Sequence, residues 1–283
     1  MGCQVPIQHN RRNLNTRCMQ NTMHEMRYLS PVCTPPGGGT CWKGTHDAVG
    51  DVTSLQQHAN TLTLEYGSSN ETRRSVLLGV EHRYAYDADG ERVAIWRSGE
   101  GTTFTLRDLS GKVLREAVDD GSGGWRWKED YVWRGGALLA TVSADGGLEH
   151  YALDHLGTPR LVTDRCGMTV ARHDYFPYGE EATSRTQDAE RMKFTSHERD
   201  FGGSPSTLDD LDYMHARTYS AVLGRFLSVD PVRGSAASPQ SFNLFAYVRG
   251  NPLALIDCPA LGGVKPPASS RKLRAFSLVA SVG

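Results

Sequence analysis

The chain has 283 residues, a formal net charge of −1 and 39% hydrophobic residues, which is enough length for one large or two modest domains with a buried core. Its 30 Gly and 13 Pro, with short runs rich in Thr, Val and Tyr, favour many short strands over a helical bundle. No segment approaches the ~20 apolar residues of a membrane span, and the first twenty residues contain no apolar stretch suited to a signal peptide.

Charge is distributed unevenly along the sequence. Residues 1–46 hold five Lys or Arg and one Glu, for +4, and residues 258–283 hold four Lys or Arg and no acid, for +4. Subtracting both from the total of −1 leaves −9 for the middle. An acidic middle argues against a nucleic-acid partner, since such proteins gather Lys and Arg on one face. We expect residues 1–46 and 263–283 to be disordered.

The cysteines give little sign of a bound metal. They lie at positions 3, 18, 33, 41, 166 and 258, without a CxxC pair and without a histidine at zinc-finger spacing. We therefore expect no metal site and no cofactor. A disulfide between Cys33 and Cys41, around a Pro-Pro-Gly-Gly-Gly stretch, stays open as an alternative to free thiols.

A repeat with a period of about 20 residues begins near Asp47. Its turn residues are Gly50, Asn70, Gly90 and Gly111, which lie 20, 20 and 21 positions apart. Gly and Asn are the residues that most readily adopt positive φ in tight turns. The spacing predicts one β-hairpin per repeat, and we assign residues 47–150 to such hairpins.

The segments between these turns alternate as half-buried strands should. They include Thr61–Tyr66, Val80–Tyr86 and Thr103–Leu106, followed by Tyr131–Trp133 and Leu138–Val142. A single hairpin cannot bury its apolar face, so neighbouring hairpins must pair into one long sheet. The sequence therefore predicts an all-β protein. A strip of this kind is expected to expose its inner face and to leave unpaired edges.

The second half of the chain carries longer motifs. They are YALDHLGTPRLVTD at 151–164, DYFPYGE at 174–180, MKFTSHERD at 192–200 and GRFLSVDP at 224–231. We interpret 211–257 as a mixture of short strands and turns. If residues 242–248 form a strand, Phe245 and Tyr247 lie on one face of it.

These motifs, together with YxYDxxGxR at 84–92, resemble those of Rhs/YD-repeat proteins and their repeat-associated core, here residues 151–262. The resemblance implies that the hairpins form part of a spiralling shell, closed by the short mixed core segment. It also implies a parent polymorphic toxin in bacteria whose shell encloses or presents a C-terminal effector. A secretion apparatus would be a further partner, and the location would be secreted or at the cell surface.

The same resemblance implies a role for Asp230 and Asp257. In many relatives the two corresponding aspartates form an aspartyl autoprotease that releases the C-terminal toxin. Two carboxylates that share a proton can supply one acid and one base. Here Cys258 replaces the proline after the second aspartate. We expect a structural protein rather than an enzyme, with residual aspartyl self-cleavage as the alternative.

Other chemical patterns have simpler structural explanations. Asp154-His155 with Arg160 and Asp164 is typical of turn hydrogen bonds and cross-strand pairs. His197-Glu198 lacks the second histidine of HExxH. A third functional hypothesis is carbohydrate binding at the cell surface by an aromatic face, formed by Trp125, Trp127, Tyr131 and Trp133.

Overall fold

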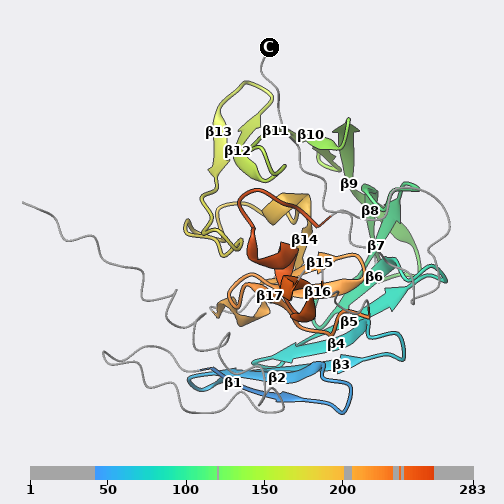
Figure 1. Ribbon diagram of the computed structural model, residues 1–283. Coiled ribbons are helices and arrows are strands. Elements are labelled where there is room, and N and C mark those ends of the chain that lie inside the picture. The colour runs from blue at the N-terminus through green and yellow to red at the C-terminus, as the bar shows by residue number, and fades with distance from the viewer. Residues whose placement is uncertain (1–41, 120, 201–205, 232–235, 237–238, 258–283) are drawn as a thin grey trace, which may run out of the picture.

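A computed structural model describes residues 42–119, 121–200, 206–231, 236 and 239–257, drawn in colour in Figure 1. The predicted disordered tail at 263–283, nearly all of the predicted disordered segment at 1–46, and the candidate Cys33–Cys41 disulfide lie outside these residues. The described part is almost entirely β-structure, as predicted from the sequence.

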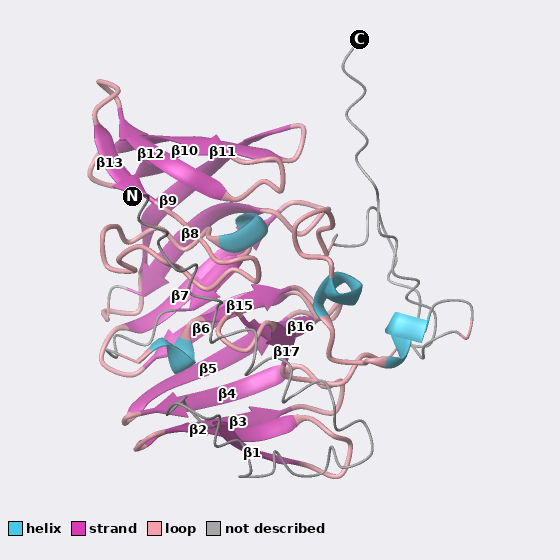
Figure 2. Ribbon diagram, turned by 60° about the vertical axis from the view of Figure 1, so that its left-hand side comes forward, coloured by secondary structure: helices cyan, strands magenta, loops and turns pink. Residues whose placement is uncertain are grey.

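The main element is one antiparallel sheet in which thirteen strands follow one another in chain order. Figure 2 shows the strands stacked from β1 to β13. They are β1 Trp42–His46, β2 Val52–Gln57, β3 Asn60–Tyr66, β4 Thr72–Leu77, β5 Val80–Tyr86, β6 Arg92–Arg97, β7 Gly101–Arg107, β8 Val113–Asp119, β9 Trp125–Arg134, β10 Ala137–Ser143, β11 Leu148–Leu153, β12 Pro159–Asp164 and β13 Thr169–Arg172. Every neighbouring pair is therefore a hairpin.

The predicted turn positions have the backbone geometry that the repeat required. Gly50, Asn70, Gly90 and Gly111 have φ values of 111°, 61°, 77° and 86°. This region of φ is open to glycine and tolerated by asparagine. The hairpin prediction and its period of about 20 residues are therefore confirmed.

An aspartate stabilises four turns of the long sheet in the same way. One carboxylate oxygen accepts hydrogen bonds from the backbone N–H groups two and four residues further on, at Asp47, Asp108, Asp154 and Asp164. Such Asx bonds satisfy donors that a tight turn leaves without backbone partners. The turn chemistry is thus local and repeats along the sheet.

One turn uses a different residue for this purpose. Gly67 stands at the position that aspartate occupies in the other turns. Here the Glu71 carboxylate bends back and accepts a hydrogen bond from the Ser69 N–H at 2.9 Å. A Cβ on Gly67 would lie 2.2 Å from a Glu71 carboxylate oxygen. Glu71 therefore occupies the space that the aspartate side chain fills in the other turns.

We predict that Gly67→Asp alone lowers the free energy of unfolding by about 1–3 kcal/mol, because two carboxylates then compete for one site. The double variant Gly67→Asp/Glu71→Thr should recover most of this loss, since Thr158 stands at the equivalent position of the Asp154 turn. Urea denaturation of the two variants measures both effects. An equal loss in the single and double variants would contradict this account of the turn.

A second, smaller sheet lies on the concave side of the first (Figure 1). It contains four antiparallel strands: β14 Glu198–Asp200, β15 Leu211–Met214, β16 Arg217–Ser220 and β17 Arg225–Phe226. Four short 3-10 helices accompany it: η1 Phe194–Ser196, η2 Thr207–Asp209, η3 Pro239–Phe242 and η4 Tyr247–Gly250.

The concave face of the long sheet is covered rather than exposed, so the expectation of an exposed inner face was wrong. Leu55 and Leu62 of the long sheet pack into one buried cluster with Leu211 and Leu227 of the inner segment. The Val52 N–H donates to the Leu227 carbonyl at 2.9 Å, which joins the two layers through the backbone. The chain thus supplies its own second layer, which a half-buried sheet needs.

Residues 242–248 do not form a strand, in keeping with the mixed structure expected for 211–257. Phe242 ends η3 and Tyr247 begins η4, with a single bridge between Ala246 and Arg225. Phe245 and Tyr247 are nevertheless both buried, through contacts with the inner segment rather than through a strand face.

The long sheet continues without a break across residue 150, where we place the boundary between the repeats and the core segment. That boundary stays a prediction. At the far end, the carboxamide of Gln187 accepts from the Arg172 N–H at 3.1 Å and donates to the Arg172 carbonyl at 2.6 Å. A side chain therefore satisfies backbone groups at the edge strand β13, which limits pairing with further strands.

Candidate functional site

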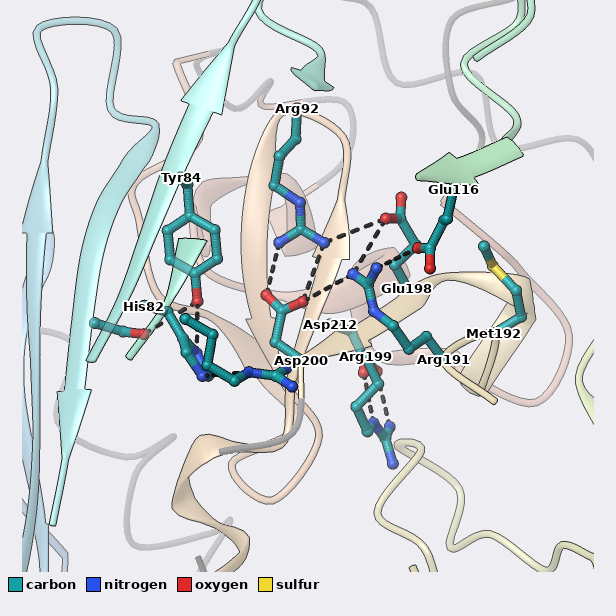
Figure 3. Close-up of polar contacts among 12 residues, drawn as sticks. His82, Tyr84, Arg92, Glu116, Arg191, Met192, Glu198, Arg199, Asp200 and Asp212 are labelled. Carbon is teal, nitrogen blue, oxygen red and sulfur yellow. Dashed lines mark hydrogen bonds and ion pairs between the residues drawn. The ribbon is translucent and has the colours of Figure 1, made fainter. Parts of the chain in front are cut away.

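The densest cluster of charged groups lies buried between the two sheets. Strands β6, β7 and β8 contribute Arg92, Arg107 and Glu116, and the inner segment contributes Arg191, Glu198 and Asp200. The six formal charges cancel. Figure 3 shows most of these side chains meeting between the layers, and we refer to all six as the ion network.

Asp200 is the acceptor at the centre of the ion network. Its two oxygens accept from the Arg92 guanidinium at 2.6 and 3.1 Å, and one of them also accepts from Arg191 at 3.2 Å. Asp200 is 2% exposed and Arg92 is 3% exposed. The fork of an arginine fits a carboxylate in this two-point geometry. The two residues are 108 positions apart in the sequence.

Glu198 and Glu116 bind the remaining guanidinium groups. Glu198 lies 2.5 Å from Arg107, 3.4 Å from Arg92 and 3.3 Å from Arg191. Glu116 pairs with Arg191, and also with Lys128 at 2.6 Å. Each acid of the ion network therefore has at least two basic partners, which reduces the electrostatic penalty of burial.

The pKa shifts of the two acids show whether burial or the neighbouring arginine charges dominate. Burial by itself would raise the pKa of Glu198, but the charges of Arg107, Arg92 and Arg191 outweigh it and lower the pKa well below its usual value. For Asp200, burial is again outweighed, here by Arg92 and Arg191, and the pKa falls. These carboxylates stay ionised at neutral pH, so neither is a proton donor.

Aromatic and neutral groups border the ion network. The Arg92 guanidinium carbon lies 4.2 Å from the centre of the Tyr213 ring, and the Tyr213 hydroxyl accepts from the Arg92 N–H at 2.8 Å. His82, whose pKa burial lowers to about 4, accepts from Arg97 Nε at 3.0 Å. The imidazole is therefore neutral and buried, and its hydrogen bond with Arg97 joins β5 to the end of β6 (Figure 3).

Arg199 and Asp212 form a second buried pair beside the ion network. Arg199 donates from Nε and Nη2 to the two Asp212 oxygens at 2.6 and 2.8 Å, and neither side chain is exposed. Nη2 also donates to the Gly179 carbonyl at 2.9 Å. This pair joins β14 to β15 and fixes the 174–180 motif against them.

The ion network was not predicted from the sequence, although its residues lie in motifs that were. Arg92 is the arginine of YxYDxxGxR, and Glu198 and Asp200 belong to MKFTSHERD. The available signal for the ion network was that each of the two motifs contains a charged residue at a fixed position. What the sequence could not show is that these motifs meet.

The structure places the two predicted site aspartates against different side chains. Asp230 pairs with Arg217 at 3.1 Å, and its backbone N–H donates to the Leu244 carbonyl at 3.0 Å. Asp257 lies near Tyr247: burial raises the pKa of the Tyr247 hydroxyl, and the negative charge of Asp257 adds to the rise. A shared proton between Asp230 and Asp257 stays a prediction.

The structural interpretation of the polar turn residues is confirmed. The Asp154 and Asp164 carboxylates accept turn N–H groups, and Arg160 donates to Asp154 at 3.0 Å. His155 contacts the Leu253 carbonyl through Nε2 at 2.9 Å. Burial lowers the pKa of His197 to about 3, with a contribution from the charge of His215, so it is a neutral core histidine.

The tryptophans do not share one face. Trp125 and Trp127 are 54% and 37% exposed, and Phe104 contacts Trp125 edge to face. Trp133 instead packs against a buried cluster and donates from Nε1 to the Val113 carbonyl at 2.7 Å. Tyr131 is buried in the same cluster. Of the aromatic residues named for carbohydrate binding, only Trp125 and Trp127 are exposed to solvent.

Comparison with known proteins connects this architecture to a group of toxins. The chain is 29% identical over 196 residues to toxin subunit YenC1 of Yersinia entomophaga, covering 62% of this chain and 19% of the relative. It is 26% identical over 178 residues to the tRNA3(Ser)-specific nuclease WapA of Bacillus spizizenii, covering 62% of this chain and 7% of the relative. No family model matches.

Solved structures give a weaker likeness. A crystal structure of TcdB2-TccC3 covers 78% of this chain and 17% of its own, with 16% sequence identity and a TM-score of 0.33. The chain thus spans less than a fifth of each of these proteins. Within the described residues, no helix has the length and hydrophobicity to cross a membrane.

Fold and site together define a class: a ribbon of consecutive hairpins, whose concave face is held to a following core segment by buried ion pairs. The motifs of the chain resemble those of Rhs/YD-repeat proteins, and its sequence is similar to the toxin subunit YenC1 and the nuclease WapA.

Proposed function

We propose that this chain is a wall section of a shell that encloses or presents a C-terminal toxin in a longer, secreted parent protein. The observation that carries the proposal is the buried ion network, which joins the repeat arginine Arg92 to Asp200 of the core segment. A network of ionised, arginine-paired carboxylates fixes the two layers together, which is a structural role.

The toxin relatives support the proposal that the parent protein carries a C-terminal toxin. YenC1 is a toxin subunit, and WapA is a nuclease. The effector, the secretion apparatus and the bacterial source are proposals drawn from these relatives, since this chain spans only a small part of each.

Flanking genomic DNA offers the direct test of the shell function. We expect further YD repeats in frame upstream and an effector coding sequence downstream of residue 283. Flanking DNA that encodes neither would contradict the proposal.

Self-cleavage is the alternative that Asp230 and Asp257 leave open, and we predict that it does not occur. Proline after the second aspartate would fix one φ near −65° and bias Asp257 toward extended backbone, whereas Cys258 does neither. Misplacing the scissile peptide by a fraction of an ångström removes transition-state stabilisation. Intact mass after prolonged incubation measures the outcome.

Asp230→Asn is the matched control for that measurement, because it removes one carboxylate and keeps the size of the side chain. We expect both proteins to retain their full mass. Loss of a fragment beginning near Gly262 from the wild type alone would establish an active protease.

Carbohydrate binding at the outer face is a separate and weaker proposal. It rests on the exposed rings of Trp125 and Trp127, with Arg115 and Asp130 paired beside them at 2.5 Å. We regard it as secondary, because exposed aromatic rings equally suit contact with a neighbouring protein.

A further inference from the structure

Arg225 on β17 is exceptional among the arginines of the inner layer. Arg191, Arg199 and Arg217 each hold a carboxylate. Within the described residues Arg225 has no ion pair, and its Nε is buried without a hydrogen-bond partner. Burial, with no opposing charge, lowers the pKa of Arg225 to about 10.

A second basic side chain lies beside Arg225. The Arg225 guanidinium carbon is 4.5 Å from the centre of the Phe245 ring, and the His46 ring packs edge to face on the same ring at 6.4 Å. His46 Nδ1 is also buried without a hydrogen-bond partner. Burial lowers the pKa of His46, and the charge of Arg225 lowers it further, whereas Asp47 opposes the shift. Two unsatisfied nitrogen groups thus face the same aromatic ring.

Burying Arg225 Nε without a hydrogen-bond acceptor is costly, since buried polar groups in proteins are normally paired. A carboxylate would remove that cost and would fit the planar fork of the arginine. We propose that Arg225 and His46 bind the carboxylate of an acidic side chain on a second, separate polypeptide.

The position of the pair indicates how such a segment would bind. His46 is the last residue of β1, and within the described residues β1 pairs only with β2. An extended segment added along β1 would form backbone hydrogen bonds and bring its side chains beside His46. Residues 258–283 contain no acid and residues 1–41 contain only Glu25, so the chain itself offers few carboxylates for this role.

Thermal unfolding of the full chain tests the site, with acetate as the probe and chloride at equal ionic strength as the reference. We expect acetate to raise the unfolding midpoint of the wild type saturably, by about 2–4 °C. Arg225→Met should abolish the rise, and His46→Phe should weaken it. Arg115→Met, which removes an exposed guanidinium on the outer face, should retain it.

Arg225→Met should also fold normally, because it replaces an unpaired charge by an apolar side chain of similar length. In chloride its midpoint should equal or exceed that of the wild type, whereas Arg199→Met, which leaves Asp212 buried alone, should lower the midpoint. An acetate rise that survives in Arg225→Met, or no rise in the wild type, would overturn the site. A rise with phosphate but not acetate would overturn its preference for carboxylate. Equal destabilisation by Glu25→Gln and Arg225→Met would overturn the proposal, because it would place the carboxylate in this chain.

Discussion

Asp200→Asn is expected to lower the free energy of unfolding by about 3–5 kcal/mol, the usual loss when one partner of a buried ion pair is removed. Asp200 accepts from both Arg92 and Arg191, and both arginine side chains are buried. The substitution leaves the ion network with three positive and two negative charges. Urea denaturation monitored by tryptophan fluorescence measures the loss.

Asp130→Asn is the matched control for this variant. It removes the same charge from an ion pair with Arg115 in which both side chains are partly exposed, so the expected loss is below about 1 kcal/mol. If the two variants lose the same stability, the ion network is not what holds the layers together. A lower m-value in Asp200→Asn would further indicate that the inner segment separates before the long sheet unfolds.

The second large effect is expected from Glu190, a buried acid without a basic partner. Its carboxylate accepts from the Tyr151 hydroxyl at 2.8 Å and from the Met192 N–H at 2.6 Å. Burial raises the pKa of Glu190 to about 7, and the negative charge of Glu129 contributes to the rise. At neutral pH this group is therefore partly protonated in the folded protein.

The direction of the pH effect follows from that shift. The folded pKa lies above the unfolded one, so the contribution of Glu190 to stability is complete below pH ~4.5 and is lost as the pH rises through about 7. Between pH 5 and pH 8.5 the wild type should lose up to about 3 kcal/mol more than Glu190→Gln, whose side chain stays neutral.

Unfolding free energies of the two proteins at several pH values give this difference directly. Asp210, whose pKa burial also raises to about 7, is present in both proteins and cancels in the comparison. Glu65→Gln, at an exposed position, should follow the wild type. Parallel pH profiles for wild type and Glu190→Gln would contradict the assignment of the buried proton to Glu190.

The sequence by itself determined the hairpin ribbon, because everything that defines it is local. The turn glycines from Gly50 to Gly111 set the period, and alternation along segments such as Val80–Tyr86 set the two faces. Pairing between consecutive strands then needs only short loops. The same local chemistry correctly assigned Asp154 and Asp164 to turns.

Only the tertiary structure decided what covers the concave face and which charges meet there. Arg92 and Asp200 lie 108 positions apart, and a guanidinium can pair with any carboxylate that the fold brings near it. Phe245 and Tyr247 have the two-residue spacing of one strand face, yet no strand forms there, and both are buried by contacts with the inner segment. The local pattern carries no information about those contacts. Burial of charge is a property of two layers together, which is why neither layer alone predicts which charges meet in the ion network or that Arg225 lacks an ion pair.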